Sequence, residues 1–161
     1  MSFKPVILIY DLDNKLVDEI AAEIGATGLY TSINTYNESN AMDAIRQYDR
    51  GFGFLTNKLS CVITGWNNYK KPRDQFLYRL RAVEKSSPLR SSTPVILVSE
   101  DHRADLKKRA LDPADGAACA YLHPDNFREA LTDLLHKVVF QKGTAELNRQ
   151  AREDLEKEIA D

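Results

Sequence analysis

The sequence predicts a doubly wound parallel β-sheet with helices on both faces, and three observations lead to that fold class. Short apolar runs alternate along the chain with segments whose apolar residues recur at helical spacing. This alternation is typical of β-α units, which place successive strands in parallel. Three runs are apolar almost without interruption, as strands buried on both faces of a sheet are. These runs are residues 6–10, 61–64 and 95–98.

The N-terminal elements follow one another as strand, helix, strand and helix. The first strand leads into a helix that Asp13 or Asn14 caps and that Gly25 ends. Residues 29–35 contain few aliphatic side chains but many β-branched and aromatic ones, which fits an edge strand. A helix over residues 39–48 comes next.

Residues 49–57 predict an ordered loop, because two glycines are interleaved there with Phe52 and Phe54. Its aromatic rings are either buried under the same domain or exposed as a patch that binds a partner. The sequence leaves both alternatives open.

The C-terminal elements continue the alternation. After the third strand, a polar loop leads to a helix with Phe76, Leu77, Leu80 and Val83 on one stripe. A loop rich in serine and proline precedes the fourth strand. The remaining predicted elements are a short helix over residues 104–111, a strand over residues 117–122 and a long helix that begins near residue 125.

The end of the chain differs in kind, so we divide the chain into a domain of residues 1–140 and a helical extension of residues 141–161. After the break at Gly143, apolar residues recur at every fourth position among charges. Such a narrow stripe buries little apolar surface on its own. The extension either docks on its own domain, on a second copy or on a partner, or stays solvated. The stripe consists of Leu147, Ala151, Leu155 and Ile159.

Composition argues against several classes of function. The 22 basic and 24 acidic residues nearly cancel, so neither a nucleic-acid surface nor membrane attachment is expected. No apolar run reaches the roughly 18 residues of a membrane helix, and the N-terminus lacks a signal-peptide profile, so we expect a cytoplasmic protein.

Cys61 and Cys119 fall in the third and fifth strands. With another strand between them they lie about 10 Å apart, beyond disulfide reach.

Four stretches at successive strand ends carry a resemblance to a known family. Their order and spacing resemble those of the receiver domains of two-component response regulators, over residues 4–140. Each stretch is short, and the similarity becomes specific only through the order of all four. The resemblance implies a flavodoxin-like sheet of order 2-1-3-4-5. The stretches are residues 7–13, 62–67, 93–99 and 116–124.

The resemblance also implies a mechanism, in which a histidine kinase transfers a phosphoryl group to an aspartate at the end of the third strand. Two acids after the first strand hold magnesium in that family, because a hard divalent ion prefers carboxylate oxygens. Here Asp11 matches the first acid, Leu12 replaces its neighbour and Asp13 lies close by. Gly65 replaces the phosphoacceptor, and glycine can neither accept a phosphoryl group nor bind a metal.

The other family positions are only partly kept. Ser99 matches the hydroxyl residue after the fourth strand, whereas His123 replaces the lysine that neutralises charge. Pro124 matches a proline that follows a cis bond in the family. Ala120 replaces the aromatic residue that couples phosphorylation to the signalling face, and Tyr121 comes one place later, on the opposite side.

The resemblance therefore implies a pseudo-receiver, a stand-alone signalling protein that is not an enzyme and uses no cofactor or metal. It is expected to bind a histidine kinase, another regulator or a second copy through the face of the fourth helix, fifth strand and fifth helix, extended by the C-terminal helix. The alternative is an atypical regulator controlled by a small anion or by unconventional phosphorylation at the degenerate pocket. An enzymatic function is the weakest hypothesis, since the sequence contains no Gly-rich phosphate loop or nucleophile–base pair.

Several site residues also have ordinary structural explanations. His123 could act as a cation, an anion ligand or a phosphorylation target. The alternative is a polar residue at the end of the strand that takes no part in any reaction or binding. Asp11 and Asp13 either bind a divalent ion weakly or cap the first helix. Trp66 follows the missing acceptor, and we expect its ring to fill or cover the vacated pocket.

Overall fold

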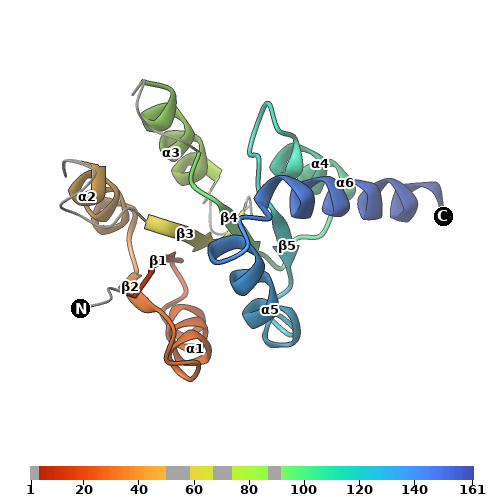
Figure 1. Cartoon of the computed structure of the whole chain (residues 1–161). Helices are drawn as coiled ribbons and strands as arrows, with labels where there is room; N and C mark the ends of the chain where they lie inside the picture. The colour runs from red at the N-terminus through yellow and green to blue at the C-terminus, as the bar shows by residue number, and fades with distance from the viewer. Residues whose placement is uncertain (1–3, 50–58, 67–73, 87–91) are drawn as a thin grey trace.

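The computed structural model describes residues 4–49, 59–66, 74–86 and 92–161 of the chain (Figure 1). Strands and helices alternate through these ranges, and a further helix follows the last pair. In chain order, the elements are β1 (Val6–Tyr10), α1 (Asn14–Gly25), β2 (Thr31–Thr35), α2 (Glu38–Asp49), β3 (Leu59–Thr64), α3 (Asp74–Ser86), β4 (Val95–Val98), α4 (Ala104–Leu111), β5 (Ala120–Leu122), α5 (Arg128–Val139) and α6 (Thr144–Ala160).

The strands form one sheet of order β2-β1-β3-β4-β5, and every described strand pair is parallel. This arrangement confirms the predicted fold class. It also confirms that the weak second strand lies at an edge of the sheet. Because all strands run the same way, their carboxyl ends meet along one edge, where α/β folds place their sites.

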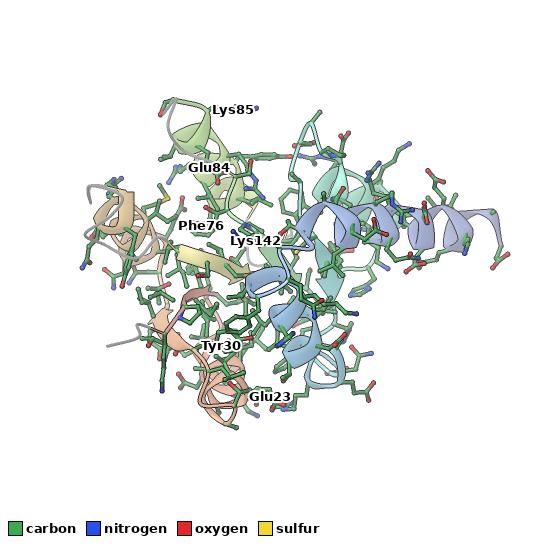
Figure 2. The ribbon with its side chains drawn as sticks, viewed as in Figure 1. Glu23, Tyr30, Phe76, Glu84, Lys85 and Lys142 are labelled. Carbon is green, nitrogen blue, oxygen red and sulfur yellow. The ribbon has the colours of Figure 1, made fainter. Side chains whose placement is uncertain are left out.

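Helices cover both faces of the sheet and bury two separate apolar clusters. On one face, α1 and α5 pack over alternate residues of the strands, including Ile7 and Ile9. On the other face, α2, α3 and α4 cover the intervening residues, including Leu8 and Val62. Figure 2 shows Tyr30 on the side of α1 and α5, and Phe76 on the side of α2 and α3.

Two elements begin later than the sequence pattern predicts. β5 begins at Ala120, because Ala117 has a φ of 54° and the N–H of Ala118 bonds back to the Ala110 carbonyl at 2.9 Å. The preceding residues therefore form the turn out of α4. Similarly, α5 begins at Arg128 after a turn that follows Pro124.

The two cysteines lie in buried positions on β3 and directly before β5, and both are free. β4 separates these strands, as expected from the sequence. Burial raises the pKa of the Cys119 thiol to about 12, so this side chain is a neutral core residue at physiological pH.

The aromatic loop of residues 49–57 falls outside the described residues from position 50 onward, so its two alternatives remain predictions. Within the described ranges, no helix combines the length and the apolar character needed to cross a membrane.

Candidate functional site

The first part of the carboxyl edge is formed by three residues after β1. Asp11 is buried, and its carboxylate Oδ1 accepts a hydrogen bond from the N–H of Asp13 at 2.8 Å. Asp13 is the N-cap of α1, because its Oδ1 accepts from the N–H of Leu16 at 3.2 Å. Leu12 between them is 42% exposed. Both acids therefore contribute to the turn from β1 into α1.

Gly65 lies at the centre of the edge, directly after β3. Tyr10 pairs with Thr64 in the register of β1 and β3, so Asp11 and Gly65 are neighbours across the strands. Gly65 is buried and brings no side chain to this position. The centre of the edge therefore has no carboxylate at the position that ends β3.

Ser99 and His123 lie side by side after β4 and β5. Val98 pairs with Leu122, and the Ser99 N–H donates to the Leu122 carbonyl at 2.9 Å. The buried Ser99 hydroxyl accepts from the N–H of Asp101 at 3.2 Å, and His123 Nδ1 accepts from the N–H of Asp125 at 3.0 Å. The polar groups of both residues thus take part in the local loop structure.

Pro124 follows His123, as the resemblance implies, but no described peptide bond is cis. The bond before Pro124 is therefore trans, which differs from the family pattern.

A second histidine lies beside His123, and sequence reasoning missed it. The His102 ring lies 5.2 Å from the His123 ring and 5.0 Å from the Tyr121 ring, centroid to centroid. The Tyr121 hydroxyl donates to the Asp101 carbonyl at 2.5 Å, and the Lys107 ammonium lies 5.8 Å from the Tyr121 ring centroid. This cluster joins the loop after β4 to β5 and α4. The His–x₂₀–His spacing gives no local signal, because the path of the loop after β4 brings the rings together.

Burial lowers the pKa of His102, and the charge of Lys107 lowers it further. Unfolding therefore takes up a proton, so the contribution of His102 to stability is complete above about pH 6.5 and is lost as the pH falls below that value. We expect His102→Gln to flatten the decline in the free energy of unfolding between about pH 7 and pH 5. Urea denaturation at several pH values measures this slope. An unchanged slope in His102→Gln would contradict this expectation.

Trp66 is fully buried on the α3 and α4 side of the sheet. Its indole N–H donates to the Leu106 carbonyl at 3.0 Å. Its ring packs edge-on against the Tyr78 ring, with 5.7 Å between the ring centroids. These contacts show Trp66 packed between two helices. Its expected role in covering the space beside Gly65 stays a prediction.

The residues predicted for the interaction face occupy different environments. Ala120 and Leu155 are buried, Leu147 and Ala151 are half-buried, and Ile159 is 56% exposed. The helix that carries four of them packs on α4 and β5 of its own chain, which is one of the alternatives left open by the sequence.

Asn148 is the polar residue that holds α6 in place. It is buried, and its Nδ2 donates to the carbonyls of Leu111 at 2.7 Å and Ala118 at 2.6 Å. Its Oδ1 accepts from Arg152 Nε at 2.9 Å. The amide group thus donates to two backbone carbonyls between α4 and β5.

A depression of about 410 Å³ adjoins the edge between α1 and the start of α5. Its lining includes four acids and two bases, so it does not favour an anionic ligand. No group of three or more metal-ligating side chains is found among the described parts of the chain. The charged lining residues are Asp13, Lys15, Glu19, Glu100, Asp125 and Arg128.

The sequence matches no protein-family profile and no curated protein. Solved structures of similar fold exist. A signal receiver domain of an HD domain-containing protein from Pseudomonas fluorescens Pf-5 aligns with a TM-score of 0.65 at 17% identity, over 95% of each chain. The chain has the receiver-domain fold.

Two further receivers support this result. A response regulator receiver domain protein from Clostridium thermocellum aligns with a TM-score of 0.62 at 17% identity, over 86% of this chain and 96% of the other. The receiver domain of Ssk1 from Saccharomyces cerevisiae, crystallised with the histidine phosphotransfer protein Ypd1, aligns with a TM-score of 0.62 at 13% identity. That match covers 86% of this chain and 91% of the other. At these identities the likeness concerns the receiver fold.

Proposed function

We propose that the protein is a pseudo-receiver, a signalling module that acts through phosphorylation-independent contacts with other proteins. The observation that carries this proposal is the absence of a side chain at Gly65, at the centre of the carboxyl edge. An acyl-phosphate requires a carboxylate at the end of β3, and the register of β1 and β3 places a buried glycine beside Asp11. The receiver fold can still transmit a signal by binding a partner.

The two acids after β1 fit this proposal, because the carboxylates of Asp11 and Asp13 both accept backbone hydrogen bonds in the turn into α1. A magnesium site built on Asp11 would lack the carboxylate that would otherwise extend from position 65. One remaining carboxylate and water are too few ligands for useful magnesium affinity. We therefore assign no metal, cofactor or enzymatic step to this edge.

The proposed partners are signalling proteins, either a histidine kinase or another regulator. The Ssk1 receiver, which shares the fold, was crystallised with a histidine phosphotransfer protein, which supports a protein partner for a domain of this fold. In this proposal residues 1–140 form the receiver-like domain and residues 141–161 the helical extension.

Incubation with acetyl phosphate and magnesium tests the proposal directly. We expect the intact mass of the protein to stay unchanged, while a receiver with an intact phosphoacceptor, treated in parallel, gains a phosphoryl group. A stoichiometric gain by this protein would contradict the proposal. The variants Ser99→Ala and His123→Ala would then locate an unconventional acceptor.

The alternative of a small anionic ligand has a separate test. Phosphate or sulfate would raise the melting temperature if it bound at the edge, and His123→Ala would remove that rise. The surplus of acids in the adjoining depression leads us to expect no such rise.

A further inference from the structure

The helix α6 lies antiparallel along α4 on one side of the molecule (Figure 1). At one end, Asn148 bonds to the carbonyl of Leu111, the last residue of α4. At the other end, the Glu158 carboxylate lies 3.3 Å from the Lys107 ammonium, nearer the start of α4. The surface under α6, formed by α4 and β5, therefore already receives a helix.

The charges on α4 indicate which kind of helix binds to this surface. α4 carries Lys107, Lys108 and Arg109 against the single acid Asp105. The part of α6 that follows Arg152 has the opposite balance, with one base, Lys157, and four acids. Glu158 pairs with Lys107, and Glu156 lines the same groove as Lys108, so an acidic helix is preferred here. The acids are Glu153, Asp154, Glu156 and Glu158.

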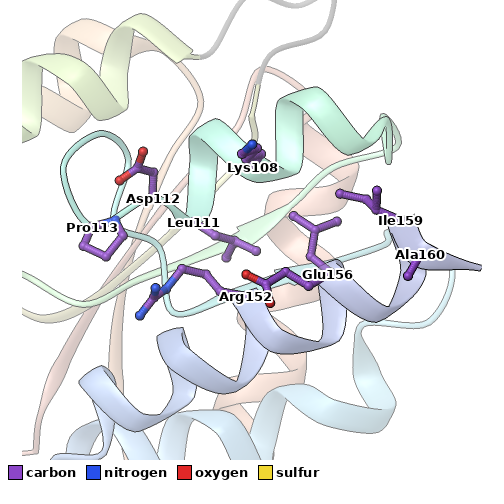
Figure 3. Close-up of a pocket in the computed structure, with 9 residues that line it drawn as sticks. Lys108, Leu111, Asp112, Pro113, Arg152, Glu156, Ile159 and Ala160 are labelled. Atoms are coloured by element: carbon purple, nitrogen blue, oxygen red, sulfur yellow. The ribbon is translucent and has the colours of Figure 1, made fainter.

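The fit of α6 on this surface is incomplete. Of its apolar residues only Leu155 is buried, while Ile159 is 56% exposed. A groove of about 510 Å³, lined mainly by apolar atoms, stays open between α4 and α6 (Figure 3). Leu111 and Pro113 line it on the α4 side. A helix with larger apolar side chains would fill this groove better than α6 does.

We propose that the surface of α4 and β5 is a docking site for an acidic amphipathic helix of a partner protein, and that α6 occupies this site until the partner displaces it. The proposal rests on the proposed function, since it specifies where a phosphorylation-independent receiver binds. The connection from α5 to α6 is short, so α6 is present at high effective concentration and competes with the partner.

The docking site is connected to the carboxyl edge through two side chains. Lys107, which pairs with Glu158 of α6, lies over the ring of Tyr121. Tyr121 in turn contacts His102 and bonds to the Asp101 carbonyl. Tyr121 thus lies between the carboxyl edge and Lys107, the residue that pairs with the acidic end of α6.

A labelled peptide of residues 143–161 tests the proposal by fluorescence anisotropy with the full-length protein. In the double variant Asn148→Ala/Leu155→Ala, the internal α6 is expected to leave its site, which hydrogen exchange of the α6 amides reports. We expect this variant to bind the peptide at least about tenfold more tightly than the unaltered protein does. Lys107→Glu, added to the double variant, should remove the gain.

A matched pair of peptides separates specific docking from net charge. The peptide with Glu156→Lys and Glu158→Lys should lose binding, because these residues face α4. The peptide with Glu146→Lys and Glu153→Lys has the same net charge but alters residues that pair with Arg149, so it should bind as the native peptide does.

Equal binding of the two altered peptides, or no binding to a folded variant whose α6 exchanges freely, would overturn the proposal. If the double variant unfolds, full-length Glu158→Lys replaces it, because this side chain is 57% exposed and its change leaves the core intact. A doubled mass by light scattering would instead identify a second copy as the occupant and overturn the partner-helix assignment. These outcomes are independent of phosphorylation, which the acetyl phosphate experiment measures.

Discussion

Replacing Arg81 with methionine is expected to lower the free energy of unfolding by about 3–5 kcal/mol. The Arg81 side chain is 8% exposed and pairs at 2.8 Å with Glu84, which is 5% exposed. Methionine would leave the Glu84 carboxylate buried without its cation. Removing one partner of a buried ion pair costs far more than the pair contributes as a whole, because an uncompensated charge stays in the interior.

Arg81 also supplies donors to backbone groups from two separate segments. Its guanidinium donates to the carbonyls of Gly116 at 3.0 Å and Thr93 at 2.8 Å. Glu84, which Figure 2 labels at the end of α3, accepts from the N–H of Thr93 in turn. The pair thus ties α3 to the start of β4 and to the turn before β5, so its loss affects three parts of the fold.

Urea unfolding of Arg81→Met measures the effect, with Arg79→Met as the matched control two residues away. Arg79 is 59% exposed in its ion pair with Glu38, so its loss should cost no more than about 1 kcal/mol. The double variant Arg81→Met/Glu84→Met should recover part of the stability, since two apolar side chains leave no buried charge. Equal effects of the two arginine substitutions would show that the buried pair adds nothing.

The sheet could be predicted from the sequence because burial on both faces imposes a continuous apolar pattern. Residues 6–10 and 95–98 have this pattern, and the structure places both in the interior of the sheet. β2 could be assigned to the edge from its polar character for the same reason. The starts of β5 and α5 could not be predicted, since local backbone bonds such as that from Ala118 to Ala110 decide them.

The contact face of α6 was only partly predictable. Residues spaced by four drift about 40° around a helix at each step, so a stripe of four such residues cannot face one surface throughout. Leu155 is therefore buried, whereas Ile159 at the end of the stripe is exposed. The residue that anchors the helix is Asn148, whose polar side chain gives no hydrophobic signal. Its role depends on two carbonyls that come together only in the fold.

The residues at the carboxyl edge were also only partly predictable from the sequence. Sequence order could place Asp11, Gly65, Ser99 and His123 at one edge, because parallel strands end together. It could not reveal that His102 packs against Tyr121, since this contact depends on the path of the loop after β4. Residues fixed by strand ends were predictable, and residues fixed by loop geometry were not.

Gly116→Ala is the second substitution with a large expected effect. A Cβ at this position would lie 2.6 Å from the carbonyl oxygen of Ala110 and 3.0 Å from its Cα, both backbone atoms at the end of α4. Neither can rotate away. The N–H of Gly116 bonds to the Arg109 carbonyl at 3.1 Å, so the close approach is held in place. We expect a loss of about 2–3 kcal/mol in the free energy of unfolding, because α4 or the turn must shift.

Gly25→Ala provides the matched control for Gly116→Ala, because it adds the same methyl group elsewhere. Gly25 is the last residue of α1, and an added Cβ there meets no atom within 4 Å. Alanine should leave stability unchanged or raise it by up to about 1 kcal/mol, since it favours helix more than glycine does. Urea midpoints at equal m-values measure both variants. If Gly116→Ala lost no more stability than the control, the turn between α4 and β5 would accommodate the added methyl group at little cost. The site that binds α6 would then be able to change its shape.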